Sequence, residues 1–128
     1  MADSKTGTDA PKRVLLALHS GTYGRTDDVV GAFILADTLL TKGHKVTILL
    51  RGDGVYAALA GQRPRTIGME SHIEHMEAAI EMGAQVLAVL EDLESRGLSS
   101  ESLVSYAEAV EERRLTAIIA EHDYWVPF

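Results

Sequence analysis

Short apolar runs alternate with polar loops and helical stripes along most of this chain. Val14–Leu18 is a continuous apolar run, which is typical of a strand buried on both faces of a parallel sheet, and Val46–Leu50 is a second β run. Between them, apolar residues recur at helical spacing from residue 29 to residue 40, and Gly43 supplies a C-terminal stop. This order of strand, loop, helix and strand predicts the right-handed unit of a parallel α/β sheet.

The second half of the chain repeats this alternation without repeating the sequence. A capping box at Ser71 and Glu74 predicts a helix that ends at Met82-Gly83. The other elements expected here are a short helix over Val55–Ala60, a strand over Val86–Leu90, a helical turn over Glu91–Ser95, a helix that starts at Ser99 or Ser100 and buries Leu103, Ala107 and Val110, a strand over Leu115–Ile119, and an edge strand over Tyr124–Phe128. We therefore predict one α/β domain over residues 13–128, with a mostly parallel sheet of four or five strands and helices on both faces.

Composition excludes several classes of function. The 128 residues suffice for one domain, and the formal net charge of −7 disfavours direct nucleic-acid binding because no basic cluster offsets it. No apolar run approaches the roughly 18 residues of a membrane-spanning helix. Residues 1–12 are polar and lack the apolar segment of a signal peptide, so we expect a disordered lead and a cytoplasmic protein. The absence of cysteine excludes disulfides, thiolate zinc sites and thiol nucleophiles.

The loop after the first strand is a candidate ligand site. It lies at the carboxyl end of a parallel strand and the amino end of a helix, where anions and small polar ligands bind in open α/β sheets. The predicted crevice combines side chains of this loop with side chains of the turn after the second strand: His19, Ser20, Tyr23, Arg25, Asp53 and Tyr56. An imidazole beside a carboxylate is a possible proton-transfer pair. Solvated residues that satisfy nearby backbone groups are the alternative for both the loop and the pair.

A second set of side chains lies on the helix predicted after Ser71. His72 and His75 are three residues apart, which brings them close enough to share a metal ion, with Glu70 as a third ligand. This spacing lacks the glutamate of known zinc-protease motifs, so a solvated or interface face is favoured. We therefore predict no bound metal and no cofactor.

Three segments resemble the DsrE/DsrF-like sulfur-relay family, which includes the TusD, TusC and TusB subunits of a tRNA thiolation relay. They are His19-Ser20-Gly21-Thr22-Tyr23-Gly24-Arg25 with the following helix and its Lys42-Gly43-His44 exit, then Gly52-Asp53-Gly54-Val55-Tyr56-Ala57-Ala58, then Gly83–Leu98 with the chain end Asp123-Tyr124-Trp125-Val126. The resemblance covers residues 13–128 and implies a DsrE-like fold. It also implies assembly into a homo-oligomer, either a trimer or a hexamer.

One position departs from this family pattern. The resemblance places Val89 where sulfur-carrying members have a cysteine, although Gly83, Arg96 and Gly97 are retained. Valine forms no persulfide, because it has no thiol. The leading hypothesis is therefore a non-catalytic subunit or binding module linked to sulfur relay or sulfur trafficking, with a cysteine-bearing relay protein as a possible partner. The alternative is a small enzyme that acts on a polar small molecule through the His19/Asp53 crevice.

Overall fold

A parallel five-stranded sheet forms the centre of the computed structural model, which describes residues 10–21 and 26–128. The strand order across the sheet is β4-β3-β2-β1-β5, and every neighbouring pair is parallel. The strands are β1 (Arg13–Leu18), β2 (Lys45–Leu50), β3 (Gln85–Val89), β4 (Ala107–Val110) and β5 (Tyr124–Pro127). The prediction of a single-domain α/β fold with a mostly parallel sheet is confirmed. The lead predicted over residues 1–12 lies largely outside the described residues.

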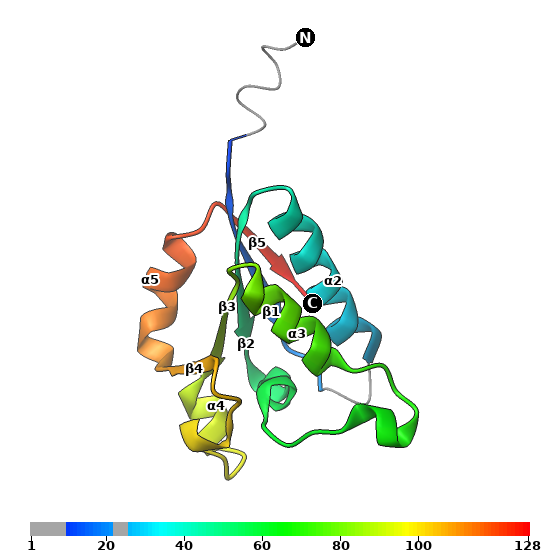
Figure 1. The fold of residues 1–128 in the computed structure, drawn as a ribbon. Coiled ribbons are helices and arrows are strands. Elements are labelled where there is room, and N and C mark those ends of the chain that lie inside the picture. The colour runs from blue at the N-terminus through cyan, green and yellow to red at the C-terminus, as the bar shows by residue number, and fades with distance from the viewer. Residues whose placement is uncertain (1–9, 22–25) are drawn as a thin grey trace.

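Helices cover both faces of this sheet (Figure 1). The α-helices are α2 (Thr26–Thr41), α3 (His72–Glu81), α4 (Leu90–Glu94) and α5 (Leu115–Ala120). Short 3₁₀ helices are η1 (Gly52–Ala58), η2 (Pro64–Ile67), η3 (Ser100–Ser102) and η4 (Glu112–Arg114). Helices α2 and α3 lie side by side on one face, whereas α5 lies on the opposite face. None of the helices in the described part of the chain is long and apolar enough to cross a membrane.

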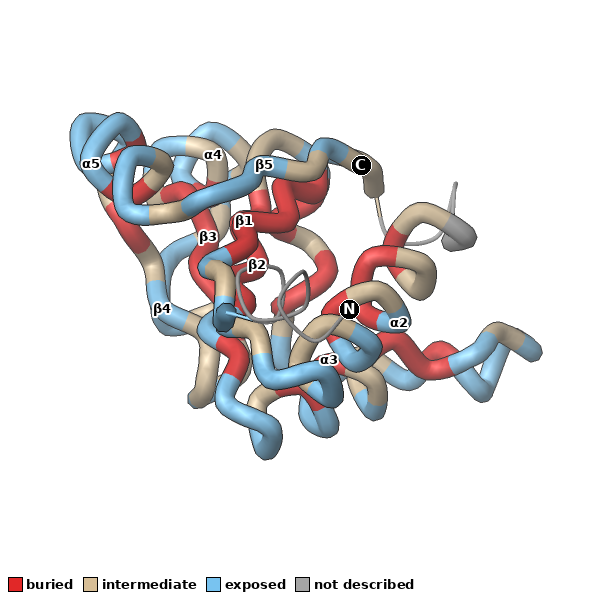
Figure 2. The backbone as a smooth tube through the Cα atoms, turned by 90° about the horizontal axis from the view of Figure 1, so that it is seen from above, coloured by how far each residue is buried: buried red, intermediate tan, exposed pale blue. Residues whose placement is uncertain are grey.

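The two faces of the sheet bury unequal cores. Successive strand residues point to opposite faces, so alternate residues of the same strand enter different cores. The face under α2 and α3 holds the larger cluster, which includes Phe33 and Met76, whereas the α5 face holds a smaller one around Leu15 and Leu87. The buried backbone is concentrated in the three middle strands (Figure 2). Burial on both faces explains why β1 and β2 are apolar after their first residues, with Thr47 as the exception.

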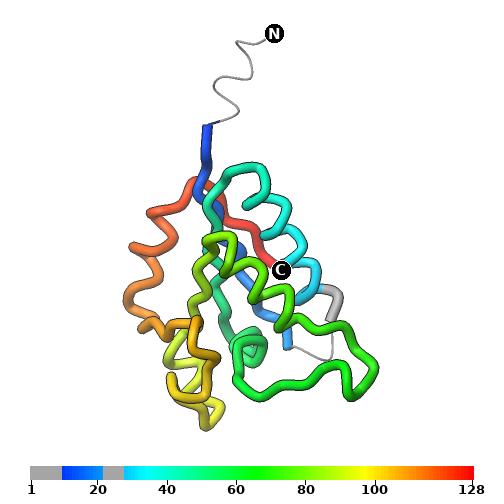
Figure 3. The backbone as a smooth tube through the Cα atoms, viewed as in Figure 1, coloured from blue at the N-terminus to red at the C-terminus, as the bar shows by residue number. Residues whose placement is uncertain are grey.

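Two sequence predictions in the last third of the chain are wrong. The segment after Ser99 forms only the short η3, and Ala107–Val110 forms β4 where a helix was expected. Residues 115–119 belong to α5 and are not a strand. Figure 3 shows the reason: β4 and β5 are opposite edges of the sheet, so the chain between them must cross the whole sheet. A short apolar run is ambiguous between strand and helix, and here the crossover requires the helix.

The remaining sequence predictions hold with small shifts. The third strand ends at Val89, one residue earlier than expected, and the helical turn α4 follows directly. The Ser71 hydroxyl caps α3 by accepting a hydrogen bond from the backbone N–H of Glu74 at 3.3 Å. Residues 124–127 form the predicted edge strand, which pairs with β1.

Candidate functional site

The predicted crevice residues within the described part of the chain lie at the same end of the sheet. His19 and Ser20 follow the last residue of β1, and Asp53 and Tyr56 belong to η1, which follows β2. The two segments are adjacent, because a Cβ built on Gly21 would lie 3.8 Å from the Cβ of Asp53. The structure therefore brings four of the six predicted residues to the carboxyl edge of the sheet. The other two, Tyr23 and Arg25, lie outside the described residues.

Asp53 is paired with Arg96, which sequence analysis did not include in the crevice. The guanidinium of Arg96 donates from Nε and Nη2 to one carboxylate oxygen of Asp53, at 3.1 and 3.0 Å. Arg96 follows α4 at the end of β3, and it also donates to the Asp92 carbonyl and the Ser95 hydroxyl. Its side chain is 25% exposed, whereas that of Asp53 is 63% exposed. Arg96 therefore ties the turn after β3 to the turn after β2.

The turn after β2 makes a second contact with the turn after β3, and it packs closely on the end of β1. The backbone N–H of Gly52 donates to the Asp92 carboxylate at 2.8 Å. Gly54 packs so tightly on the end of β1 that a Cβ at this position would lie 2.1 Å from the Leu18 carbonyl oxygen. Only glycine, which has no Cβ, permits this approach. The close packing on β1 therefore requires glycine at position 54.

The end of β1 is also fixed from its other side. The Ser20 hydroxyl donates to a carboxylate oxygen of Asp28, at the start of α2, with a distance of 3.1 Å. The backbone N–H of His19 donates to the Phe128 carbonyl at 3.3 Å. The His19 residue itself is exposed, and no hydrogen bond joins its ring to Asp53 among the described residues. The edge therefore offers an accessible imidazole and, on the neighbouring turn, a carboxylate that already has a cationic partner.

Val89 occupies the end of β3, beside these turns. It is fully buried within the smaller core and directly precedes α4. A saturated hydrocarbon side chain in this environment has neither a thiolate nor a lone pair to attack sulfur. The position that the family resemblance assigns to the sulfur acceptor is thus inert in this chain.

The two histidines of α3 lie in different environments. His72 is 2% exposed, and its Nε2–H donates to the Ala57 carbonyl at 3.2 Å. Burial lowers the pKa of His72 below its ordinary value. His75 instead contacts the carboxylate of Glu70. Within the described ranges, no three histidine, aspartate or glutamate side chains are grouped to hold a metal ion.

Comparison with known proteins gives relatives for nearly the whole chain. The chain is 33% identical over 106 residues to an uncharacterized protein of Methanocaldococcus jannaschii, covering 83% of this chain and 90% of the relative. It is 30% identical over 110 residues to an uncharacterized protein of Methanopyrus kandleri, covering 86% and 88%.

Solved structures share the fold at lower sequence identity. The crystal structure of the YchN protein from E. coli matches with a TM-score of 0.79 and 22% identity, over 92% of this chain and 99% of that one. A protein of unknown function from Methanobacterium thermoautotrophicum matches with a TM-score of 0.72 and 11% identity, over 91% and 99%. The model of the DsrE/DsrF-like family matches residues 12–128. The chain therefore belongs to the DsrE/DsrF-like family.

Proposed function

We propose that this protein is a non-catalytic subunit or binding module in sulfur trafficking, which acts beside a cysteine-bearing relay protein. The observation that carries the proposal is the contrast at the end of β3. The surrounding turns are held by the Asp53–Arg96 pair and by the Gly52–Asp92 contact, while the acceptor position is a buried valine. A surface whose turns are held in place, but which has no nucleophile, is suited to docking a partner protein.

The chemistry of sulfur transfer supports the same role. A persulfide relay moves a sulfur atom when a thiolate attacks the outer sulfur of a donor persulfide and the donor thiolate leaves. Both partners in that step need a cysteine sulfur, and this chain has none. We therefore assign the sulfur-carrying step to the partner, with this chain contributing a binding surface.

The ligand-binding role of the carboxyl edge remains part of this proposal. We propose that an ion or small polar ligand binds there, through His19, Ser20, Tyr23, Arg25, Asp53 and Tyr56. The ion pair between Asp53 and Arg96 favours binding over proton transfer, because the Asp53 carboxylate is already engaged by the Arg96 guanidinium. A small enzyme that uses the His19/Asp53 pair would need this ion pair to open.

We further propose that the protein acts as a homo-oligomer, either a trimer or a hexamer. Several large apolar side chains are exposed on the single chain: Ile34, Ile67, Met82, Tyr124 and Trp125. Assembly would remove such side chains from water. By contrast, the apolar side chains of Val55, Ala57 and Ala58 are already buried inside the chain. Sedimentation equilibrium at micromolar concentration tests the assembly, and a monomer alone would refute it.

The experiment for the relay role uses a cysteine desulfurase with ³⁵S-cysteine as the sulfur source. The protein is incubated with this source alone and together with a cysteine-bearing DsrE-like protein from the same organism. We expect the label on the partner only, with a transfer rate that rises when this chain is added.

A pair of arginine variants links that rate to the carboxyl edge. Arg96→Ala removes the tie between the two turns and should lower the stimulation of transfer. Arg113→Ala removes an exposed arginine of a similar surface ion pair, with Glu111, and should leave the stimulation unchanged. Stable label on this chain, or no effect of this chain on transfer to any such partner, contradicts the proposal. Turnover of a small molecule that depends on both His19 and Asp53 would favour the enzyme.

A further inference from the structure

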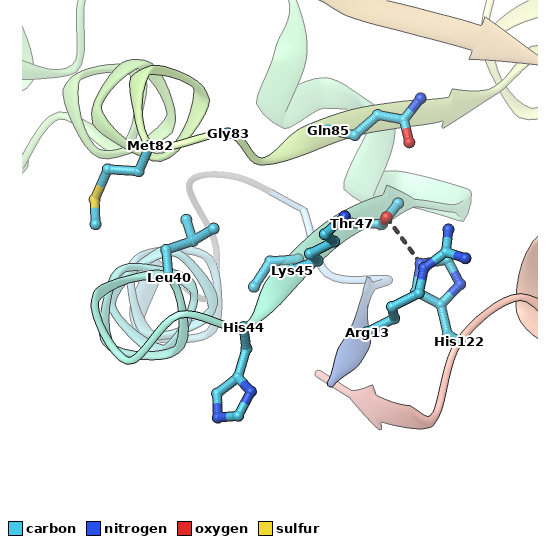
Figure 4. A pocket seen from close by; sticks show the side chains of 10 residues that line it. Arg13, Leu40, His44, Lys45, Thr47, Met82, Gly83, Gln85 and His122 are labelled. Atoms are coloured by element: carbon cyan, nitrogen blue, oxygen red, sulfur yellow. Dashed lines mark hydrogen bonds between the residues drawn. The ribbon is translucent and has the colours of Figure 1, made fainter. Parts of the chain in front are cut away.

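A cavity of about 360 Å³ lies at the amino edge of the sheet, opposite the turns described above (Figure 4). Its walls come from the first residues of β1, β2 and β3, the ends of α2 and α3, and His122 from the segment before β5. The volume is in the range of small-molecule sites in proteins. The cavity is separate from the proposed relay surface.

Two cations lie side by side in this wall. Arg13 and Lys45 are direct partners in the register between β1 and β2, so their side chains leave the same face of neighbouring strands. Like charges in such a position repel each other. Neither side chain has a hydrogen-bond or ion-pair partner among the described residues. Among the residues that the structure describes, no aspartate or glutamate lines the cavity.

The carboxylates of this region form no ion pair with Arg13 or Lys45 within the described ranges. Asp123 accepts a hydrogen bond from the backbone N–H of Arg13 at 2.8 Å, rather than from its guanidinium. Glu108 and Glu121 line a neighbouring cavity of about 280 Å³, together with Arg114. That cavity shares Arg13, Gln85 and His122 with the first one, but its acidic residues are not among those that line the first cavity. The first cavity is thus a local cationic site on a protein with net charge −7.

His122 is oriented by two hydrogen bonds beside these cations. Its Nδ1 lies 2.7 Å from the Ile118 carbonyl oxygen, which only accepts, so Nδ1 carries a proton. Its Nε2 lies 2.8 Å from the hydroxyl of Thr47, which is itself buried. In the neutral ring, Nε2 accepts the Thr47 proton.

We propose that this cavity binds the phosphate group of a small molecule. A guanidinium, an ammonium and the Gln85 amide supply more N–H donors than the two oxygens of a carboxylate can use, whereas a phosphate has three free oxygens. A bound dianion also relieves the repulsion between Arg13 and Lys45. Leu40 and Met82 line the opposite side of the cavity and suit the uncharged part of the ligand (Figure 4).

The experiment is a titration of ¹⁵N-labelled protein with inorganic phosphate, followed by NMR at constant ionic strength against potassium chloride. We expect saturable shifts at the amides of Arg13, Lys45, Thr47 and His122. The double variant R13Q/K45Q should weaken phosphate binding by about tenfold or more, because charge-assisted hydrogen bonds are lost. Lys42→Gln removes one exposed lysine that does not line the cavity, and it should change the affinity by less than about twofold.

Three outcomes would overturn the assignment. They are shifts that do not saturate beyond those of chloride, an effect of Lys42→Gln as large as that of R13Q/K45Q, and binding of acetate as tight as that of phosphate. The amide spectrum reports whether each variant is folded, so loss of binding is distinguished from loss of structure. Because the assay involves no sulfur transfer, its result is independent of the relay proposal.

Discussion

The two edges of the sheet differ in whether their charged side chains are paired within the chain. At the carboxyl edge, Asp53 meets Arg96 and Asp92 meets the N–H of Gly52, so each carboxylate has a partner within the chain. At the amino edge, Arg13 and Lys45 are neighbours and have no carboxylate partner for their side chains in the described structure. The charges at the carboxyl edge are therefore paired within the chain. The cations at the amino edge have no such partner among the described residues, which is why we propose a phosphate ligand there.

The largest expected effect tests how tightly the carboxyl edge is built. Gly54→Ala should lower the free energy of unfolding by about 3 kcal/mol or more, since the new Cβ would overlap backbone atoms of Leu18 that cannot move aside. Gly31→Ala is the control, because a Cβ there meets nothing within 4 Å, and it should stabilise α2 by up to about 1 kcal/mol. Urea denaturation measures both. Equal stabilities of the two variants would show that the edge is loosely packed.

The next effect concerns His72, which packs on η1 beneath the same edge. His72→Leu removes the hydrogen bond to the Ala57 carbonyl and should cost about 1 to 2 kcal/mol at pH 7.5. Burial lowers the pKa of His72, so the unfolded state takes up the proton first as the pH falls through 6.5. The free energy of unfolding of the wild type should therefore decrease below pH 6.5.

The His72→Leu variant should lack this component of the pH dependence. His19→Gln, at an exposed position, serves as the control and should retain it. Urea denaturation between pH 5 and pH 8 supplies the comparison. Equal slopes of the unfolding free energy against pH in the wild type and in His72→Leu would contradict the assignment of this pH dependence to His72.

A smaller effect is expected at the amino edge, from the bond that orients His122. Thr47→Val preserves the shape of the side chain and removes its hydroxyl, leaving Nε2 of His122 without this partner. The cost should be about 1 kcal/mol. Thr38→Val, on the exposed surface of α2, should cost less than about 0.5 kcal/mol. A loss as small as that of the control would mean that the histidine is not held by Thr47.

The smallest effect should come from the ion pair itself. Asp53→Asn removes the charge, but the Asp53 carboxylate is largely exposed, so the loss should stay below about 1 kcal/mol and shrink in high salt. Glu111→Gln, in the exposed pair with Arg113, should have an effect of similar size. A loss several times larger would show that the pair stabilises the whole fold rather than only the alignment of two turns.

Sequence patterns were sufficient for the first two thirds of the fold. Strands β1 and β2 are buried on both faces after their first residues, so these positions are apolar except for Thr47, and the pattern predicts strands. At residues 103, 107 and 110 the apolar spacing matches a helix, yet β4 is an edge strand whose apolar residues alternate with Glu108. Leu115–Ile119 carries no periodicity that separates strand from helix. Their assignment depends on the sheet order, which no local pattern contains.

The candidate site was predictable to a similar extent. The carboxyl ends of parallel strands meet at one edge, so placing His19 near Asp53 required only the strand order of β1 and β2. Arg96 was missed as a partner of Asp53, because the link depends on β3 lying next to β2 and on α4 turning the chain back. The amino-edge cavity was missed entirely. Its walls come from Arg13, Lys45, Gln85 and His122, which are distant in sequence and join only in the folded sheet.

The position of β5 next to β1 has a consequence for the order of folding. The contact between the N–H of Arg13 and Asp123 spans 110 residues, far more than the contacts between β1 and β2. Closing so long a loop is entropically costly, so β1, β2 and β3 with their helices should assemble first. During synthesis on the ribosome, the outer side of β1 then remains an open template for strand pairing until residues 124–127 emerge. That interval is when a nascent copy is most exposed to pairing with the wrong chain.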